Sequence, residues 1–246
     1  MHQFFVEDCQ IGRKYVTITG NDVRHIRQVL RMRPGETIRI SSLSGQSMFC
    51  SITEVTQEFV SAEIITEAPN TELPSEIILF QAIPKGDRME TVIEKTVELG
   101  VAEIIPVAMK YCVVKLDAKK AAAKQKRWKA IAETAAKQSK RSRIPELKEV
   151  QSFADACAAA KALDLCIVPY ENARGMESMK GVVQQIRPGM RIGVFIGPEG
   201  GFADEEIRAL EPMAEIVSLG KRILRTDTAA ITMLSLLMTI LESDNS

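Results

Sequence analysis

Two glycine-containing segments near the carboxyl end decide the fold of this chain: Ile196-Gly-Pro-Glu-Gly-Gly-Phe202 and Leu219-Gly-Lys-Arg-Ile-Leu-Arg-Thr-Asp-Thr-Ala229. Each follows a short apolar run, at 192–196 and 216–219, that indicates a buried strand. The sequence therefore predicts two turns side by side at the ends of parallel strands, where α/β proteins bind small molecules. Because glycine lets a ligand approach main-chain groups closely, we expect a pocket made largely of backbone.

The rest of the chain changes its pattern once. Apolar and polar residues alternate from 37 to 65, which predicts a small antiparallel sheet or barrel, and the turn-forming stretch 69–75 then interrupts the pattern. Beyond it, apolar runs alternate with helical patterns, which predicts an α/β domain with a mostly parallel sheet covered on both faces. The expected strands are 77–83, 103–107, 165–169, 192–196 and 216–219, and the expected helices include 89–100, a basic helix at 118–140 and an apolar helix at 227–241. We predict two domains, 1–70 and 76–246, with a linker at about 69–75.

Composition places the chain among ordinary globular proteins, with 46% hydrophobic and 26% charged residues in 246. No stretch approaches the roughly 20 apolar residues of a membrane span, and the amino terminus lacks the pattern of a signal peptide, so we expect a cytosolic protein. The five cysteines have no CxxC spacing, and the two histidines lie far from any cysteine pair. We therefore expect reduced thiols and no metal site.

Charge is unevenly distributed along a chain whose net charge is zero. Residues 115–148 contain twelve lysines and arginines against three acidic residues, a net charge of +9. Such a segment can bind a polyanion by displacing its counterions, or it can be an ordinary solvated helix face. Charge alone leaves both interpretations open.

The glycine turns do not match a phosphate-binding loop. The chain has no GxxxxGK[ST] motif, and no GxGxxG follows an early strand. In addition, Glu199 puts a carboxylate in the first turn, which would repel a phosphate and favour a cationic ligand. The alternative for Glu199 is a structural carboxylate that holds neighbouring N–H groups.

The paired motifs resemble the carboxyl-terminal signature of the SPOUT methyltransferases and, within them, the family that methylates N3 of a uridine in 16S rRNA (the RsmE family). Further stretches match this family in its order along the chain, so the resemblance covers most of the sequence. They are Pro84-Lys-Gly-Asp-Arg-Met-Glu90, Glu98-Leu-Gly100, Arg127-Trp128, and Gln138-Ser139 with Arg141 and Pro145. The resemblance implies a PUA-like RNA-binding β-barrel at the amino end, followed by a SPOUT domain with a trefoil knot.

The same resemblance implies an S-adenosylmethionine-dependent enzyme that acts on 16S rRNA of the small ribosomal subunit. A sulfonium cation suits a loop that carries Glu199, and backbone groups of the second loop would contact the adenine. The implied cofactor-binding residues are Pro169, Tyr170, Glu171, Ile196, Gly197, Glu199, Gly200, Leu219, Gly220, Ile223 and Leu224. For Tyr170, ordinary packing at a strand end is the alternative.

Two residues of the second motif are candidates for catalysis. Arg225 carries a fork of donors that can stabilise the developing uridine anion or meet an adjacent phosphate. Asp227 is the nearest carboxylate and could accept a proton or orient the arginine. The family usually has glutamate at this position, and helix N-capping ahead of Thr228 explains the shorter aspartate equally well.

RNA contacts are expected from basic side chains, because phosphate contacts position a nucleic acid. The candidates are Arg24, His25, Arg27, Arg31, Arg33, Lys85, Arg88, Arg127, Lys137, Lys140, Arg141 and Arg143. His25, Arg31 and Lys85 match elements of the family, whereas Lys137 and Lys140 depart from its usual residues. The amino terminus also departs, since His2 stands where the family commonly has arginine, and His25 could equally be an ordinary polar surface group.

A homodimer is expected from the resemblance, with the final helix as the contact face. The helix residues that could form this face are Ala229, Ala230, Met233, Leu236, Leu237 and Ile240, whose alternative is burial within the subunit's own core. Two other functions remain open from the sequence. One is a SPOUT enzyme that methylates a ribose 2′-hydroxyl or a tRNA base, and the other is a non-catalytic RNA-binding adaptor.

Overall fold

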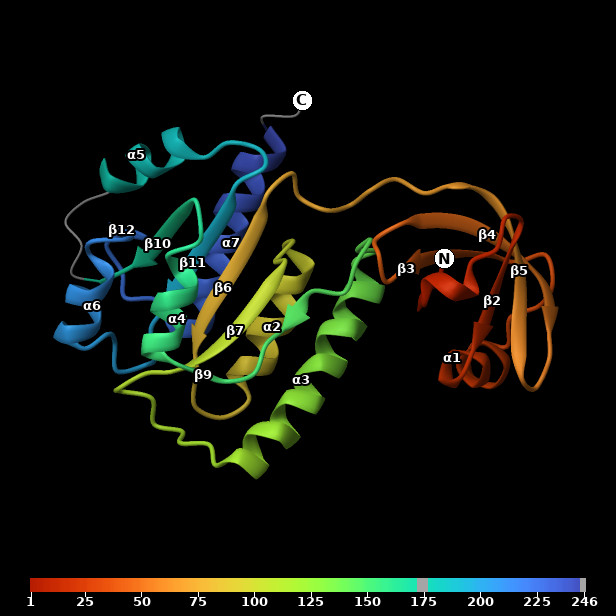
Figure 1. The fold of residues 1–246 in the computed structure, drawn as a ribbon, viewed down its shortest axis with the longest axis horizontal. Helices are drawn as coiled ribbons and strands as arrows, with labels where there is room; N and C mark the ends of the chain where they lie inside the picture. The colour runs from red at the N-terminus through yellow and green to blue at the C-terminus, as the bar shows by residue number, and fades with distance from the viewer. Residues whose placement is uncertain (172–176, 244–246) are drawn as a thin grey trace. The chain divides into compact units, whose positions relative to one another are not determined.

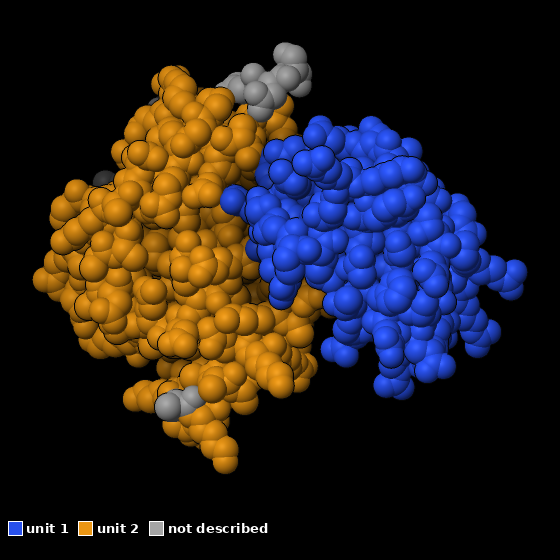
Figure 2. Space-filling model, turned by 45° about the vertical axis from the view of Figure 1, so that its right-hand side comes forward, with its two compact units in different colours: residues 1–72, 136–144 blue, residues 73–135, 145–246 orange. Residues whose placement is uncertain are grey.

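The chain, described by a computed structural model over residues 1–171 and 177–243, forms two compact units. Unit 1 comprises Met1–Glu72 and Ala136–Ile144, and unit 2 comprises Leu73–Ala135 and Pro145–Ser246 (Figure 2). Residues 136–144 comprise the end of the long basic helix and the residues after it, and they pack with the amino-terminal residues. Unit 1 is therefore built from two separate stretches of chain.

Within the described residues, unit 1 contains a five-stranded sheet in the order β1-β3-β4-β5-β2 (Figure 1). Its strands are β1 (Gln3–Val6), β2 (Tyr15–Thr19), β3 (Thr37–Ser42), β4 (Ser47–Val55) and β5 (Phe59–Glu67). All neighbours are antiparallel except β1 and β3, which run parallel. The predicted small β domain is confirmed, with three strands where the alternation indicated them. The two edge strands, β1 and β2, were not predicted.

A short helical segment follows β2 and was also not predicted. It begins with α1 (Asn21–Arg24), which continues directly into a π-helical segment (His25–Leu30). A separate 3-10 turn (Asp8–Gln10) precedes β2. Val23 and Ile26 of this segment are buried in the core of unit 1. The segment ends at Arg31, whose left-handed backbone (φ 54°) is uncommon for a residue with a side chain.

A buried ion pair joins the two stretches of unit 1. Glu72 accepts hydrogen bonds from the Arg141 guanidinium, with Nε 2.9 Å from Oε1, and from the Ser142 N–H at 2.9 Å. The Arg141 side chain is only 3% exposed, and Arg143 also contacts Glu72. Gln3 adds a bond from its amide to the Arg141 carbonyl at 2.6 Å. The stretch after the basic helix is thereby held against β1 and the end of the amino-terminal stretch.

Unit 2 contains a parallel sheet in the order β12-β10-β11-β6-β7-β8, with β9 also paired to β7. Its strands are β6 (Glu76–Ala82), β7 (Glu103–Ala108), β8 (Glu146–Leu147), β9 (Gln151–Ser152), β10 (Leu165–Pro169), β11 (Arg191–Ile196) and β12 (Glu215–Val217). Its helices are α2 (Arg88–Glu98), α3 (Ala118–Gln138), α4 (Phe153–Ala160), α5 (Glu177–Gln185), α6 (Asp204–Leu210) and α7 (Thr226–Ser243), and the last residues of α3 count with unit 1. The predicted parallel α/β sheet is confirmed.

Helices cover both faces of this sheet, because alternate side chains of each strand point to opposite sides. Ile78 and Phe80 of β6 belong to a core that includes residues of α4 and α6. Phe80 stacks on Phe195 of β11 with ring centroids 4.2 Å apart. Helices α2 and α7 pack against each other on the other face (Figure 1). On α3, Trp128 is buried while Lys126, Arg127 and Lys129 are exposed.

The two motif strands are not neighbours, although the segments that follow them lie side by side as predicted and are joined by a hydrogen bond. Strand β10 lies between β11 and β12 and pairs with both. Short apolar strands carry no signal for their order in a sheet, so the sequence could not show this. As a result, three strand ends rather than two meet at the carboxyl edge of the sheet.

The final helix is largely part of its own subunit's core. Of the residues expected to form a dimer face, Ala230, Met233 and Leu237 are buried, whereas Ala229, Leu236 and Ile240 are half-buried. None of the helices in the described part of the chain is long and apolar enough to cross a membrane.

Replacing Glu72 should destabilise unit 1 strongly. Glu72→Gln keeps the shape of the side chain but leaves the buried Arg141 charge uncompensated, a change that typically costs about 3–5 kcal/mol. Chemical unfolding of the purified protein measures the loss. Glu63→Gln is the matched control, because Glu63 forms an exposed pair with Lys14 and such pairs contribute about 0–1 kcal/mol.

The Glu72 effect should also depend on pH. Burial raises the pKa of Glu72, but the hydrogen bonds and the positive charge of Arg141 lower it by more. The net pKa therefore lies below the usual 4.5. A carboxylate with a lowered pKa stabilises the folded state above pH 4.5 and loses this contribution as pH falls through its folded value. The difference between wild type and Glu72→Gln should therefore shrink below pH 4.5. A difference that is constant with pH would contradict this assignment.

Candidate functional site

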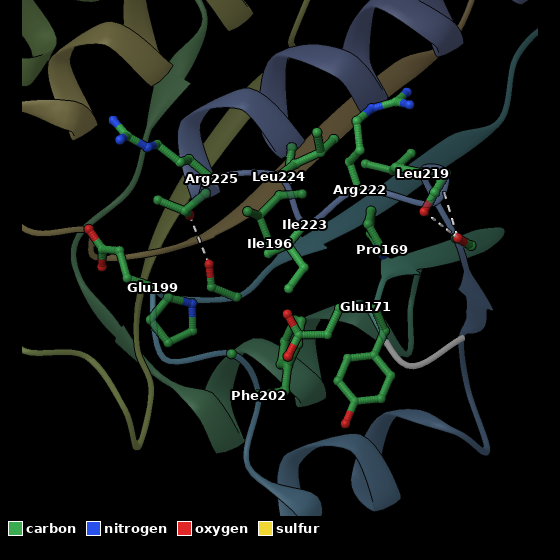
Figure 3. Close-up of a pocket in the computed structure, with 18 residues that line it drawn as sticks. Pro169, Glu171, Ile196, Glu199, Phe202, Leu219, Arg222, Ile223, Leu224 and Arg225 are labelled. Carbon is green, nitrogen blue, oxygen red and sulfur yellow. Dashed lines mark hydrogen bonds between the residues drawn. The ribbon is translucent and has the colours of Figure 1, made fainter. Parts of the chain in front are cut away.

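A cavity of about 240 Å³ lies where β10, β11 and β12 end, close to the lower end of the roughly 300–1,000 Å³ range of small-molecule pockets. Three stretches of chain form its walls (Figure 3). They are Pro169, Tyr170 and Glu171 after β10; Ile196, Gly197, Pro198, Glu199, Gly201 and Phe202 after β11; and Ser218, Leu219, Gly220, Arg222, Ile223, Leu224, Arg225, Thr226 and Ala229 after β12.

The structure brings together all but one of the residues expected to bind the cofactor. Gly200 is the exception, since its backbone lies beside Tyr111 instead of lining the cavity. Seven further lining residues were not predicted: Pro198, Gly201, Phe202, Ser218, Arg222, Thr226 and Ala229. All seven belong to the two motifs or adjoin them, so their place in the sequence was the signal that could have found them.

The first loop is shaped by a close packing contact. A Cβ atom on Gly197 would lie 2.9 Å from the Phe202 ring, so only glycine fits there. The Gly201 N–H donates to the Pro198 carbonyl at 2.9 Å and closes the turn. The Phe202 ring contacts Tyr170 edge to face, with centroids 6.3 Å apart. Tyr170 thus packs in the wall, as the alternative interpretation held, and it lines the cavity as well.

The second loop leaves β12 through a glycine with a left-handed backbone. Gly220 has φ 114°, and the Ser218 hydroxyl both accepts from the Gly220 N–H and donates to its carbonyl, each at 3.2 Å. Ile223 follows at the cavity wall and is 82% exposed. An apolar side chain this exposed at a cavity is available to cover an apolar ligand surface.

One hydroxyl group ties the loops to the sheet. Thr226 Oγ1 donates to the Gly197 carbonyl at 2.8 Å and accepts from Gln81 Nε2 at 2.9 Å. Gln81 is fully buried in β6 and was not predicted as part of the site. A glutamine within the apolar run 77–83 was the available signal, because buried polar groups need hydrogen-bond partners. This connection fixes the first loop against the start of α7.

Two carboxylates at the cavity have different surroundings. Glu199 accepts from the Lys85 N–H at 2.9 Å and from Arg88 at 2.5 Å, and Figure 3 shows its carboxylate turned away from Glu171 and Ile223. Burial raises the pKa of Glu199, but the bonds from Lys85 and Arg88 lower it more, so the net pKa is below its ordinary value. Glu199 therefore has the structural role that was the alternative in the sequence.

Glu171 is the second carboxylate at the cavity. It is exposed, it lines the cavity, and its Oε1 lies 3.5 Å from the position of a Cβ on Gly201. No hydrogen bond or ion pair engages this carboxylate among the residues that the structure describes. A positively charged ligand in the cavity would be attracted to it.

Comparisons with known proteins show the family of the chain. Residues 71–238 match a family of RNA methyltransferase domains, and residues 18–65 match a family of RNA methyltransferase PUA domains. The chain is 36% identical to ribosomal RNA small subunit methyltransferase E of Bacillus subtilis, over 89% of this chain and 88% of the relative. The chain belongs to the ribosomal RNA small subunit methyltransferase E family.

Solved structures of relatives have the same fold as this family member. The Neisseria gonorrhoeae ribosomal RNA small subunit methyltransferase E, bound to S-adenosylmethionine, is similar with a TM-score of 0.82, 31% identity and 98% coverage of both chains. A putative methyltransferase of Legionella pneumophila, in complex with the same cofactor, gives a TM-score of 0.80 and 33% identity over 97% of this chain and 98% of its own. The predicted family and the predicted RNA methyltransferase class are confirmed.

The two catalytic candidates of this methyltransferase lie at the start of α7. Arg225 lines the cavity, and its carbonyl accepts the Ala229 N–H at 2.8 Å, so Arg225 itself occupies the position before the helix. Asp227 lies within the first turn, which excludes the capping position proposed for it ahead of Thr228. It is half-buried outside the lining, and its Oδ1 has no hydrogen-bond partner in the described residues.

The basic residues proposed for RNA contact in unit 1 fall into two groups. Arg24, His25, Arg31 and Arg33 are exposed, and Arg27 is half-buried. The basic residues of the stretch 136–144 form hydrogen bonds or ion pairs within unit 1. Lys137 pairs with Asp22 at 3.3 Å, the Lys140 ammonium donates to the Lys137 carbonyl, and Arg141 and Arg143 contact Glu72. The assignment of Arg141 to RNA is corrected, because its guanidinium is buried against a carboxylate.

The basic residues proposed for RNA contact in unit 2 also differ in availability. Lys85 is exposed, whereas Arg88 is bound to Glu199. Arg127 pairs with Glu90 at 2.7 Å, but its side chain is 66% exposed. The described residues contain no cluster of three or more histidine, cysteine, aspartate or glutamate side chains that could hold a metal ion.

Removing the Thr226 hydroxyl should loosen the site. Thr226→Val keeps the shape but leaves the Gly197 carbonyl without its donor, a loss that typically costs about 1–3 kcal/mol. We expect a melting temperature about 2–10 °C lower, measured by thermal unfolding. Thr239→Val is the matched control on the same helix, since the Thr239 hydroxyl bonds to Ser235 on the exposed surface. Equal melting of both variants would contradict the role of Thr226.

Proposed function

We propose that this family member is an S-adenosylmethionine-dependent methyltransferase that modifies N3 of a specific uridine in 16S rRNA of the small ribosomal subunit. The observation that carries the proposal is the three-walled cavity built from the two family motifs and the end of β10. The cofactor bound to the Neisseria gonorrhoeae relative supports the choice of ligand. The uridine and its N3 atom are attributes of the resembled family.

The cavity residues fit this ligand. Apolar side chains of Ile196, Leu219 and Ile223 can cover an adenine, and backbone groups of the second loop can bind its polar edge. The Glu171 carboxylate faces the same space and can attract the positive charge. When bound, S-adenosylmethionine supplies a methyl group on a sulfonium sulfur.

The protein must make uridine N3 nucleophilic. This nitrogen carries a proton at neutral pH, and its negative charge spreads onto the flanking carbonyl oxygens once the proton leaves. Holding the base in line with the methyl group supplies much of the rate enhancement, and preorganised donors aimed at the carbonyl oxygens supply more. The site therefore needs a donor at the cavity wall and an acceptor for the proton.

Arg225 is the proposed donor. It lines the cavity at the start of α7, and Figure 3 shows its side chain leaving the loop in a different direction from Arg222. A guanidinium offers several N–H groups in one plane and can meet the O2 or O4 atom of the uridine anion. Its backbone is fixed by the bond to Ala229, which limits the motion of the donor.

Asp227 is the second proposed catalytic residue. Its Oδ1 atom is buried without a partner among the described residues, so it can accept a proton. Because Asp227 lies outside the lining, a proton from N3 would reach it through a bridging water. Proton acceptance of this kind contributes typically about 10²–10⁴ in rate.

Exposed basic residues are proposed to hold the RNA backbone. In unit 1 these are Arg24, His25, Arg31 and Arg33, and in unit 2 they are Lys85 and Arg127. The Arg127–Glu90 pair is exposed and weak, so a phosphate can replace the carboxylate. Charges of this kind position the substrate, whereas base contacts give specificity.

Three further attributes complete the proposal. The half-buried residues Ala229, Leu236 and Ile240 of α7 are available for a two-fold contact in a homodimer. The enzyme would act in the cytosol, where ribosomal subunits are found, and it would need no metal.

The relatives do not support the alternative functions, which were a ribose or tRNA methyltransferase and a non-catalytic adaptor. The relatives named above are small-subunit rRNA methyltransferases or methyltransferases with bound cofactor.

Deleting the gene should remove one modification from 16S rRNA. A methyl group on N3 blocks Watson–Crick pairing, so reverse transcription of rRNA from wild-type cells should stop at one uridine. The stop should disappear in the deletion strain and return when the gene is restored. Loss of a ribose 2′-O mark, or of a tRNA mark, with no such stop would overturn the proposed target.

Replacing Arg225 should separate catalysis from cofactor binding. We expect Arg225→Ala to reduce methyl transfer by well over tenfold, because a lost transition-state donor typically costs about 10²–10³. Calorimetry should give nearly unchanged affinity for S-adenosylmethionine. Arg208→Ala on the surface of α6 controls for a lost positive charge. Unchanged turnover in Arg225→Ala would remove this residue from the mechanism.

A further inference from the structure

Tyr111 is an exposed aromatic residue beside the cofactor loop that neither motif includes. It follows β7, and its side chain is close to the loop after β11: a Cβ on Gly200 would lie 3.0 Å from Tyr111 Cβ and 3.6 Å from its Cγ. Gly200 stands between Glu199 and Gly201, which both line the cavity. Tyr111 is nevertheless 46% exposed. A flat aromatic surface is therefore presented next to the cavity wall.

The turn that carries Tyr111 is held firmly on both sides. Met109 and Cys112 are buried, and the Cys112 N–H donates to the Met109 carbonyl at 3.1 Å. The Lys110 N–H donates to Glu206 Oε1 at 2.9 Å, while Oε2 of the same carboxylate accepts from the Ala203 N–H. Tyr111 is thus presented on a fixed turn and loses little conformational freedom when a ligand covers its ring.

Charges around this turn are mutually compensated. Lys110 Nζ lies 5.7 Å from the centre of the Tyr111 ring and 2.5 Å from Glu205, and Arg88 is bound to Glu199. Arg88 is therefore engaged with the loop after β11, whereas the exposed Lys110–Glu205 pair can still exchange its carboxylate for a phosphate. Beside these charges, the surface offers a nucleic acid the face of an aromatic ring.

We propose that Tyr111 stacks on an unpaired base of the rRNA next to the target uridine. This inference rests on the proposed function. A base that reacts at N3 must be unpaired or turned out of its stack, so its neighbour loses a stacking partner. Aromatic side chains replace such partners in the recognition of single-stranded RNA, since every base has a π-face. Tyr111 lies beside the loop that forms one wall of the cavity, so its exposed ring is available to a base that flanks a uridine bound there.

Kinetics of the full-length protein on small ribosomal subunits test the proposal. Stacking on one base typically changes affinity about 5- to 150-fold, so Tyr111→Ala should raise the KM for RNA by a factor in this range. Tyr111→Phe keeps the ring and should stay within about twofold of wild type. The dissociation constant for S-adenosylmethionine should not change in either variant.

Tyr15→Ala is a matched control on unit 1. Tyr15 is 44% exposed, with Lys14 Nζ 5.4 Å from its ring centre and paired to Glu63, so it reproduces the surroundings of Tyr111 away from the cofactor loop. We expect wild-type kinetics for this variant. An equal rise of KM in Tyr15→Ala would overturn a specific role for Tyr111.

A photocrosslink on the wild-type protein gives a second measurement that does not require a variant to fold. Small-subunit rRNA with 5-bromouridine near the target should crosslink to Tyr111, as mapped by mass spectrometry. The stacking proposal is overturned by crosslinks only elsewhere, by unchanged KM in Tyr111→Ala, by weaker cofactor binding, or by a changed oligomeric state. If the wild type methylates no small-subunit RNA, the proposed function itself is contradicted. If the wild type is active, the outcomes above contradict only the role of Tyr111.

Discussion

The cavity depends on a single hydroxyl group that binds two segments far apart in the sequence. Thr226 donates to the loop after β11 and accepts from Gln81 in β6, so the start of α7 is fixed to the sheet and to the first motif at once. The two motifs belong to strands that do not touch each other, because β10 separates them. This connection holds the start of α7 and the first loop at hydrogen-bond distance from each other. Packing of Phe202 on Gly197 then sets the shape of the first loop.

The electrostatic field in the cavity depends on which of its two carboxylates already has a positively charged partner. Glu199 has its charge compensated by Arg88 and the Lys85 N–H, so it shapes the loop and adds little net field. Glu171 has no such partner in the described residues, and it faces the cavity. Its charge is therefore available to attract a cation that binds in the cavity.

Much of the fold could be predicted from the sequence, because its central strands are continuous apolar or alternating runs. The run 77–83 is an example, and it forms β6 between β11 and β7. The edge strand β2 alternates in the same way but was not predicted. Strand β1 could not be predicted from periodicity, because it is only four residues long and its Gln3 is a buried polar residue that donates to Ser41 and to the Arg141 carbonyl. The site was found through local motifs, whereas Gln81 lies 145 residues from its partner. Interactions over such distances, like the order of strands, leave no periodic signal.

The basic residues show the same limit in another form, because burial rather than residue type decides what a charge can do. Arg141 and Arg127 both belong to the segment with net charge +9, but one is buried against Glu72 and the other is mostly exposed. A buried pair cannot exchange its carboxylate for a phosphate without leaving a desolvated charge behind, which costs several kcal/mol. An exposed pair makes that exchange at almost no cost. The polyanion-binding capacity of the chain is therefore smaller than its sequence indicates, and it lies with the cations that remain exposed.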